Sequence, residues 1–324
     1  MDWHGKSIRM GALVLAVAVI LRLWSAGALE TVYAALVSPT VGSFLLYLET
    51  GRVIRPVPDP TELDPAKPDP TEEEPALPER PQFSAGDASL VRVWGTGEAV
   101  DPAVFLERTL DMDLTGEAPT VLILHTHATE SYTQAQGWTY EESSNYRTLD
   151  TDHNMVAIGT YLTELLEAGG IQVIHDTTLH DYPEYTGAYT RSEATARKHM
   201  EDHSGIFLVL DLHRDSLSDD QGGELDTSAL VKGRESAQLM FLMGTDHDAW
   251  QENMNLAVKL TAQLERTYPG ITRGILTRND DYNQYLTPGT LLVEVGAAGN
   301  TQEEAMMAAE ALAEAILALK YGVE

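Results

Sequence analysis

From about Val91 to the end of the chain, short apolar runs alternate with longer stretches in which apolar residues recur every three or four positions. The first pattern is typical of buried strands and the second of helices that lie on a sheet. Their alternation predicts a single α/β domain, doubly wound, with a mostly parallel open sheet. The predicted strands are residues 121–124, 171–174, 206–210, 238–243 and 291–295. The predicted helices are residues 155–168, 192–202, 248–268 and 303–320.

Ionisable side chains stand at the ends of three of these strands. His125 and His127 follow the first strand in VLILHTHATESY, His213 closes FLVLDLH, and Glu294 interrupts the apolar run TLLVEV. Ligands of open α/β sheets bind beyond the carboxyl ends of the strands. Because an unpaired polar group is costly in a buried strand, its repetition at three strand ends indicates one shared site, and a metal would provide it.

The chain contains no cysteine, so a metal must be held by His, Asp or Glu. Two imidazoles and one carboxylate are the usual ligands of catalytic zinc, which polarises a carbonyl and lowers the pKa of a water toward about 7. The apolar neighbours of Glu294 should raise its pKa into the range of a proton carrier. Taken singly, each histidine could instead be a buried imidazole whose hydrogen bonds are satisfied.

The N-terminal pattern is that of a membrane anchor or a signal sequence, predicted at residues 1–30. Lys6 and Arg9 precede the apolar run MGALVLAVAVIL, and Arg22 follows it at a point from which its side chain can reach the interface. Positive charge before the run and acidic sequence after it favour a cytoplasmic N-terminus. We therefore expect a single-pass protein of the cell membrane with its main domain outside the cytoplasm.

Two further segments separate this region from the predicted domain at residues 83–324. Residues 31–55 are apolar but are interrupted by Pro39 and Gly42, which indicates a membrane-proximal helical segment. Residues 56–82 form an acidic, proline-rich linker that holds nine of the fifteen prolines. Such a composition cannot bury a core and acts as a spacer. The formal net charge of −29 argues against nucleic acid as a partner.

The blocks ILHTHATESY, VIHDTT, DLHRDS, YNQYL and LLVEVGAAGN, with SFLLYLETGRV before the linker, resemble the stage II sporulation protein P family. That family is related to the zinc N-acetylmuramoyl-L-alanine amidases. The resemblance implies a zinc amidase-like fold and cleavage of the amide between muramic acid and L-alanine in peptidoglycan. It also implies endopeptidase activity on the cross-links, and work alongside stage II sporulation protein D during engulfment of the forespore.

Carried over by motif, the resemblance implies zinc ligands at His127 and His213 and a catalytic glutamate at Glu294. The amidases place a glutamate ligand just before their first long helix. The residue at the comparable offset here is Asp150, which could instead cap the helix. Three other candidates for this ligand remain open: Asp152, His153 and Glu130.

Six residues are further candidates for supporting the ligands or contacting the substrate: His125, Glu130, Arg191, Arg214, Tyr282 and Asn283. His125 could coordinate in place of His127, because strand alternation points both side chains the same way. Arg214 could bind a stem-peptide carboxylate or neutralise the neighbouring aspartates. His199 and His203 have a spacing that can bind zinc, but their acidic neighbours favour a solvated helix face.

Other classes of function also fit the sequence. The domain could be a non-catalytic peptidoglycan-binding scaffold that recruits other cell-wall hydrolases. It could also be a zinc hydrolase of a small soluble amide, or a membrane-tethered structural protein whose histidines belong to the core. Zinc content separates the last of these from the others.

Overall fold

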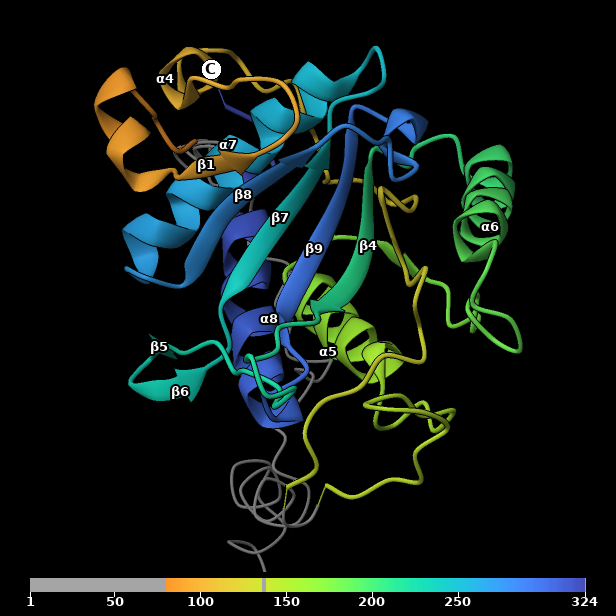
Figure 1. The fold of residues 1–324 in the computed structure, drawn as a ribbon. Coiled ribbons are helices and arrows are strands. Elements are labelled where there is room, and N and C mark those ends of the chain that lie inside the picture. Colours follow the sequence, from red (N-terminus) through yellow and green to blue (C-terminus); the bar gives the residue numbers. More distant parts are fainter. Residues whose placement is uncertain (1–79, 136–137, 324) are drawn as a thin grey trace, which may run out of the picture. The chain divides into compact units, whose positions relative to one another are not determined.

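A seven-stranded β-sheet lies at the centre of the computed structural model, which describes residues 80–135 and 138–323 (Figure 1). Its strands are β1 (Val93–Gly95), β2 (Val121–Leu124), β3 (Val173–His175), β4 (Leu208–Asp215), β7 (Leu239–Gly244), β8 (Thr272–Arg278) and β9 (Gly289–Ala297). Their order is β1-β8-β7-β9-β4-β2-β3, and of these neighbours only β7 and β9 run antiparallel within the described part of the chain. The predicted α/β fold with a mostly parallel sheet is confirmed.

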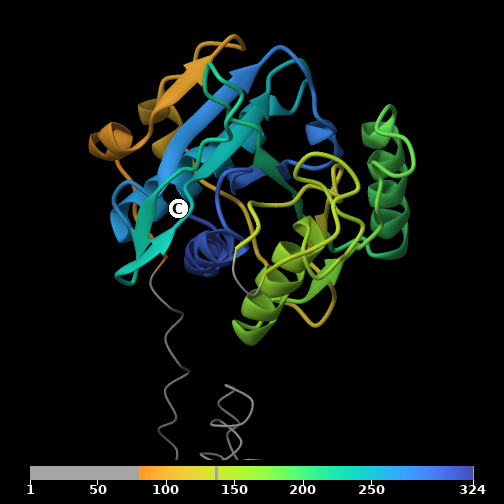
Figure 2. The ribbon, with the colours of Figure 1, turned by 60° about the horizontal axis from the view of Figure 1, so that its bottom comes forward.

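Helices α5 (Met155–Ala168), α7 (Trp250–Thr267) and α8 (Gln302–Leu319) lie on one face of this sheet, and α6 (Ala188–Asp202) packs on the other face near β2 (Figures 1 and 2). The apolar residues of α5, α7 and α8 form the main core with the strands. Helix α6 packs Ala196 against Leu122 of β2 and Val209 of β4. Three short helical segments complete the unit: η1 (Ala85–Leu90), α4 (Pro102–Leu106) and η2 (Gln284–Leu286).

Strand alternation places His213 and Glu294 on the face that carries α6. The core side of β4 consists of Leu208, Leu210 and Leu212, and that of β9 consists of Leu291, Val293 and Val295. Successive side chains of a strand point to opposite faces, so the residues between them turn the other way. His213 and Glu294 are such residues, and they are register partners on adjacent parallel strands. The carboxyl ends of β2, β4 and β9 therefore bring their polar side chains to the same edge.

Capping residues and a glycine fix the ends of the helices. The side chain of Asn154 caps α5 by accepting a hydrogen bond from Val156 N at 3.0 Å. Asn154 therefore occupies the cap position considered for Asp150. At the other end, Gly170 has a φ of 83°, a conformation that glycine adopts without strain. Helix α8 opens with a capping box between Thr301 and Glu304.

Four strands lie outside the predicted set: β1, β8 and the hairpin β5 (Ala229–Val231) and β6 (Arg234–Ser236). Strand β8 begins with Thr272, Arg273 and Gly274, so its apolar run is too short to mark it. Strand β4 also extends to Asp215, beyond the predicted end at residue 210, because its polar residues still pair with β9.

The described residues lie within one compact unit, Leu77–Glu324. The predicted segments at residues 1–30 and 31–55, and most of the linker at 56–82, fall outside the described residues. Among the residues that are described, no helix combines the length and the apolar character needed to cross a membrane.

Candidate metal centre

Three buried side chains meet at the carboxyl ends of β2 and β4: His127, Glu130 and His213. We call these three residues the metal group. One ligand atom from each lies within 4.8 Å of the others. Glu130 Oε1 is 3.7 Å from Nδ1 of His127, and Glu130 Oε2 is 3.6 Å from Nδ1 of His213. The two imidazole rings stand at 85° to each other with their centroids 5.0 Å apart. The carboxylate thus faces both rings at once.

These residues fit a zinc ion. Two ligand atoms bound tetrahedrally at the usual zinc distances lie about 3.3 Å apart, close to the two separations between Glu130 and the histidines. Two imidazoles with one carboxylate are also the donor set of many catalytic zinc sites, which keep a further position for water or substrate.

Asp211 holds the ring of His213 from the side opposite Glu130. Its Oδ1 lies 3.0 Å from Nε2 of His213, which is an ion-pair contact without hydrogen-bond geometry. The same carboxylate accepts hydrogen bonds from the backbone N–H of Thr126 at 2.7 Å and from its hydroxyl at 2.6 Å. A carboxylate on the outer nitrogen of a metal-binding imidazole fixes the orientation of the ring. Nδ1 of His213 is therefore the atom presented to the site.

The protonation of the two histidines differs because their neighbours differ. Burial alone would lower the pKa of His213, but the charges of Asp211 and Glu130 raise it well above its usual value. Burial, followed by the charge of His213, lowers the pKa of His127 to about 4. The metal-free site therefore holds one imidazolium between two carboxylates, and His127 is neutral at pH 7.

Glu130 is fixed by groups that favour its charged form. The backbone N–H of Arg214 donates to Oε2 at 3.3 Å, and Nη2 of Arg147 donates to Oε1 at 3.1 Å. Burial would raise the pKa of Glu130, but its contacts with His213, and then the charge of Arg214, bring that pKa down to about 2. The carboxylate is ionised, as a metal ligand must be.

Glu294 lies beside this group on β9 and has the opposite character. It is buried, and its Oε2 has no hydrogen-bond partner among the described residues. Burial first, and then the charges of Glu130 and Asp215 against that of His213, raise its pKa to about 8. A carboxyl group with a pKa near neutrality can both accept and return a proton.

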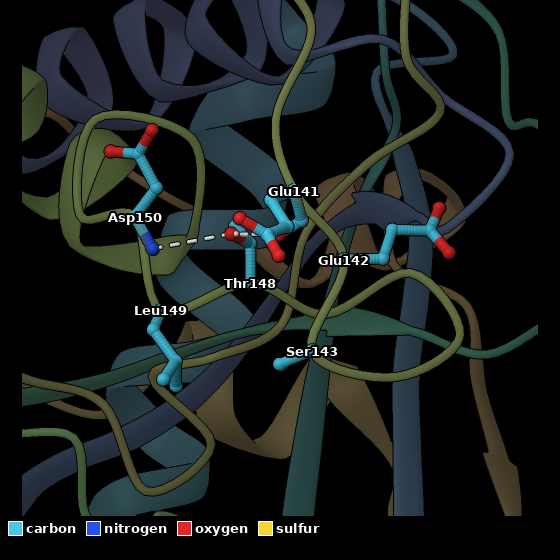
Figure 3. A pocket seen from close by; sticks show the side chains of 6 residues that line it. All are labelled: Glu141, Glu142, Ser143, Thr148, Leu149 and Asp150. Atoms are coloured by element: carbon cyan, nitrogen blue, oxygen red, sulfur yellow. Dashed lines mark hydrogen bonds between the residues drawn. The ribbon is translucent and has the colours of Figure 1, made fainter.

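The structure does not bring Asp150 to the histidines. Its side chain is 46% exposed and pairs with Nδ1 of His153 at 2.9 Å. Together with Glu141, Glu142, Ser143, Thr148 and Leu149, it lines a cavity of about 470 Å³ (Figure 3). Asp152 and His153 belong to the same turn before α5. Glu130 reaches the site instead because its N–H bonds to the carbonyl of His127 at 3.1 Å, which turns the chain back toward β4.

The stage II sporulation protein P (SpoIIP) family model matches residues 61–317. The chain belongs to this family. Stage II sporulation protein P of Bacillus subtilis (strain 168) is 28% identical over 222 residues, which cover 65% of this chain and 53% of that protein. The chain thus spans about half the length of this curated relative.

Solved structures similar to this SpoIIP-family chain include two amidases. N-acetylmuramoyl-L-alanine amidase AmiC2 of Nostoc punctiforme is 16% identical, with 63% of this chain and 97% of that chain covered and a TM-score of 0.38. The CwlD amidase from Clostridioides difficile, in complex with the GerS lipoprotein, is 17% identical, with 61% and 94% covered and a TM-score of 0.37. Both TM-scores lie below 0.5, so these likenesses say nothing about activity.

His125 lies beneath the metal group of this SpoIIP-family chain rather than in it. Its Nε2 is 2.9 Å from Nε2 of His175, and its Nδ1 is 3.3 Å from the carbonyl oxygen of Leu212. Burial lowers the pKa of His125 to about 3, so the ring is neutral. His125 thus joins β2 to β3 and to β4 just before His213. His199 of α6 pairs with Asp176 at 2.9 Å, and His203, which follows the last residue of α6, is exposed.

The two arginine candidates bind main-chain carbonyls. Arg214 donates from Nε to Ser131 O and from Nη2 to Tyr146 O, each at 3.0 Å. Arg191 donates to three carbonyls of one loop: His180 O at 2.6 Å, Thr186 O at 3.1 Å and Glu184 O. Among the described residues, the cation paired with Asp215 is Arg273, at 2.8 Å. Arg191 and Arg214 therefore support loops around the site.

Tyr185, Tyr189 and Tyr282 lie beside the histidines, and we call these three residues the tyrosine wall. The sequence did not indicate Tyr185 or Tyr189 as site residues. Tyr185 stacks on His127 with centroids 4.5 Å apart and planes at 22°, and Tyr189 meets the same ring edge-on at 5.6 Å. Tyr282 lies 5.9 Å from Tyr189. The signal for the missed pair is the tyrosine-rich loop YPEYTGAY that follows β3.

The other two sequence candidates help to hold this wall. Tyr282 and Asn283 have φ angles of 47° and 59°, a left-handed conformation that is rare for non-glycine residues. Nδ2 of Asn283 donates to the carbonyl oxygen of Tyr189 at 2.9 Å. Such conformations cluster at functional sites, where surrounding contacts enforce them.

Proposed function

We propose that this chain is a zinc-dependent peptidoglycan hydrolase, an N-acetylmuramoyl-L-alanine amidase with endopeptidase activity as a second specificity, acting in sporulation and forespore engulfment. The observation that carries the proposal is the group His127, Glu130 and His213 with the buried carboxyl group of Glu294 beside it. Membership of the stage II sporulation protein P family supports the cell-wall setting.

His127, Glu130 and His213 would hold the zinc ion. When bound there, zinc would act as a Lewis acid that polarises the amide carbonyl and lowers the pKa of a water molecule. Asp211 keeps the ring of His213 in orientation, at 3.0 Å from its outer nitrogen. The contacts of Glu130 with Arg147 and Arg214 keep its carboxylate toward both rings.

Glu294 is the proton carrier of the proposed reaction. Its carboxylate takes a proton from the water that attacks the amide carbon, and the carboxylic acid returns this proton to the departing nitrogen as the C–N bond breaks. The products are a lactyl carboxylate and a free amino terminus. A pKa of about 8 in the metal-free site shows how strongly burial favours the protonated form of Glu294.

The wall formed by Tyr185, Tyr189 and Tyr282 bounds the space in front of the metal group. Tyr185 is 57% exposed although it stacks on a buried ring, so it offers its outer surface to a substrate. Burial raises the pKa of Tyr189 well above its usual value, so its phenol stays neutral and can donate a hydrogen bond.

Residues 1–30 are proposed to anchor the chain in the cell membrane, with the hydrolase domain outside the cytoplasm and close to peptidoglycan. Lys6, Arg9 and the apolar run after them support this topology. Stage II sporulation protein D is proposed as a partner because of the family resemblance.

The function is tested with the full chain and purified sacculi. We expect about one zinc per chain by metal analysis, release of soluble peptide from sacculi, loss of release with a chelator, and recovery when zinc is added back. A chain that binds sacculi but releases nothing, with or without zinc, would instead support the non-catalytic scaffold.

A further inference from the structure

Arg147 touches the metal group and the tyrosine wall at the same time. It donates to Glu130 at 3.1 Å and to Asp181 at 2.6 Å, and its guanidinium lies over the ring of Tyr185 at 5.1 Å. We propose that Arg147 is a positioning residue that couples the loop at residues 180–187 to the ligand Glu130, so that the metal group and the Tyr185 wall become ordered together. This inference rests on the zinc site of the proposed function.

The contacts of Arg147 close a ring of four side chains. Glu130 contacts Arg147, Arg147 covers Tyr185, Tyr185 stacks on His127 at 4.5 Å, and His127 faces Glu130 at 3.7 Å. Two of the four are candidate ligands of the metal, and one is the exposed surface offered to a substrate. A change in the loop is therefore transmitted to the ligands through direct contacts on two sides.

The loop is fastened on several sides. Nδ1 of His180 lies 2.8 Å from the carbonyl oxygen of His125, and its Nε2 lies 3.0 Å from Oγ1 of Thr195. Arg191, on α6, holds carbonyl oxygens at both ends of the loop, His180 O and Thr186 O. Asp181 is fastened from the side of the metal group, because it accepts hydrogen bonds from Thr129 N at 3.2 Å and Thr129 Oγ1 at 2.6 Å as well as from Arg147. Of these attachments, the one at Asp181 leads through Arg147 to Glu130. Arg191 bonds to carbonyls of the same loop without touching Glu130, which makes it a matched control for Arg147.

The charges explain why an arginine is needed here. The side chains of Asp181 and Glu130 are 0% and 7% exposed, so both carboxylates require a buried partner. The planar guanidinium bonds to both at once and also presents its face to Tyr185, which an ammonium cannot do. Replacement of Arg147 should therefore free Glu130 and the loop together.

The test compares variants of the full chain by zinc affinity and by hydrogen exchange of residues 180–187. Arg147→Gln and Arg147→Lys should weaken zinc binding about 10- to 100-fold, the usual effect of removing a group that orients a ligand. In Arg147→Gln, exchange in the loop should rise at least about fivefold, and zinc should no longer protect the loop. Arg191→Lys should also speed exchange but change zinc affinity less than about threefold.

The reciprocal variant Glu130→Gln tests the coupling between Glu130 and the loop in the absence of metal. It provides this test even if the Arg147 variants fail to fold. The coupling requires that loss of the Glu130 charge speeds exchange at residues 180–187 in the metal-free protein. Unchanged exchange there, or equal loss of zinc affinity in Arg191→Lys and Arg147→Lys, would overturn it. Because neither readout uses peptidoglycan, a failure of the proposed hydrolase activity leaves this result unaffected.

Discussion

His213 and Glu294 are register partners on adjacent parallel strands, so a candidate metal ligand and a buried carboxyl group occupy fixed, neighbouring positions. The surroundings of the two side chains differ: His213 has charged neighbours, whereas Glu294 is affected mainly by burial. Two carboxylates raise the pKa of His213, whereas burial raises the pKa of Glu294 to about 8, and one oxygen of Glu294 has no hydrogen-bond partner among the described residues. Pairs of ionisable groups held in contrasting environments are typical of acid–base sites.

Glu294→Gln should abolish hydrolysis while leaving the metal group intact. Removal of a general base commonly costs about 10²- to 10⁴-fold in rate. Glu294 lies outside the three-residue ligand group, so zinc affinity should change less than about threefold. Rates of peptide release from sacculi and zinc titrations check both halves. A variant that hydrolyses at close to the original rate would remove Glu294 from this role.

Glu130→Gln and Asp150→Asn distinguish the two carboxylates considered for the third ligand. Glu130 faces both histidines, whereas Asp150 is on the surface and bonds to His153. Zinc affinity should fall at least about 100-fold in Glu130→Gln and less than about threefold in Asp150→Asn. The reverse order, measured by competition with a chelating dye, would return the ligand to the position before α5.

Zinc binding should release a proton from His213. This residue is an imidazolium in the metal-free site and must be neutral to bind metal, whereas His127 is already neutral at pH 7. Apparent affinity should therefore rise about tenfold per pH unit near neutrality. Calorimetry in buffers of different ionisation enthalpy counts the proton, in a Glu294→Gln background so that only His213 contributes. Asp211→Asn should reduce the release, and an unchanged count there would contradict the assignment.

The metal-free protein should lose stability with rising pH because of Glu294. Its pKa of about 8 in the folded protein exceeds the ordinary glutamate value of 4.5, so the native state binds more protons than the unfolded state between these two values. The contribution of this group is fully present below about pH 4.5 and is lost toward pH 8, with an upper limit of about 4–5 kcal/mol. Denaturation at pH 5 and pH 8.5 with a chelator should therefore show Glu294→Gln gaining on the unaltered chain. A constant difference would contradict the raised pKa.

Gly159→Ala should destabilise the fold beneath the site. An added Cβ would lie 2.5 Å from Nε2 of both His125 and His175, the pair that joins β2 to β3. Overpacking typically costs about 1–3 kcal/mol, more than the gain of up to about 1 kcal/mol in helix propensity. Gly116→Ala is the control, because its nearest non-adjacent atom is 3.8 Å away. Denaturant midpoints of the two variants should differ, with only Gly159→Ala lowered.

The sequence predicts the scaffold better than the loops. Hydrophobic periodicity located five strands of the sheet, but the start of β8 at Thr272 and Arg273 is too polar to be recognised. Ionisable residues in or just after the apolar runs likewise indicate His127, His213 and Glu294, although β4 continues to Asp215 and β9 to Ala297.

Contacts between loops leave no periodic pattern of apolar residues in the sequence. The position of Asp150 just before α5 favoured it as the third ligand. The turn closed by the N–H of Glu130 instead brings Glu130 to the histidines. Arg147 and Tyr185 are far apart in the chain and meet where the loop carrying Asp181 lies against the site. Such meetings depend on tertiary packing, which a single sequence does not display.

The most direct test of the central claim is mass analysis of the fragments that the zinc-loaded full chain releases from sacculi. We predict stem peptides with a free L-alanine amino terminus and glycan strands left intact. Zinc bound to the chain with no such peptides released would contradict the amidase assignment, and peptides cut only at the cross-links would replace it with an endopeptidase.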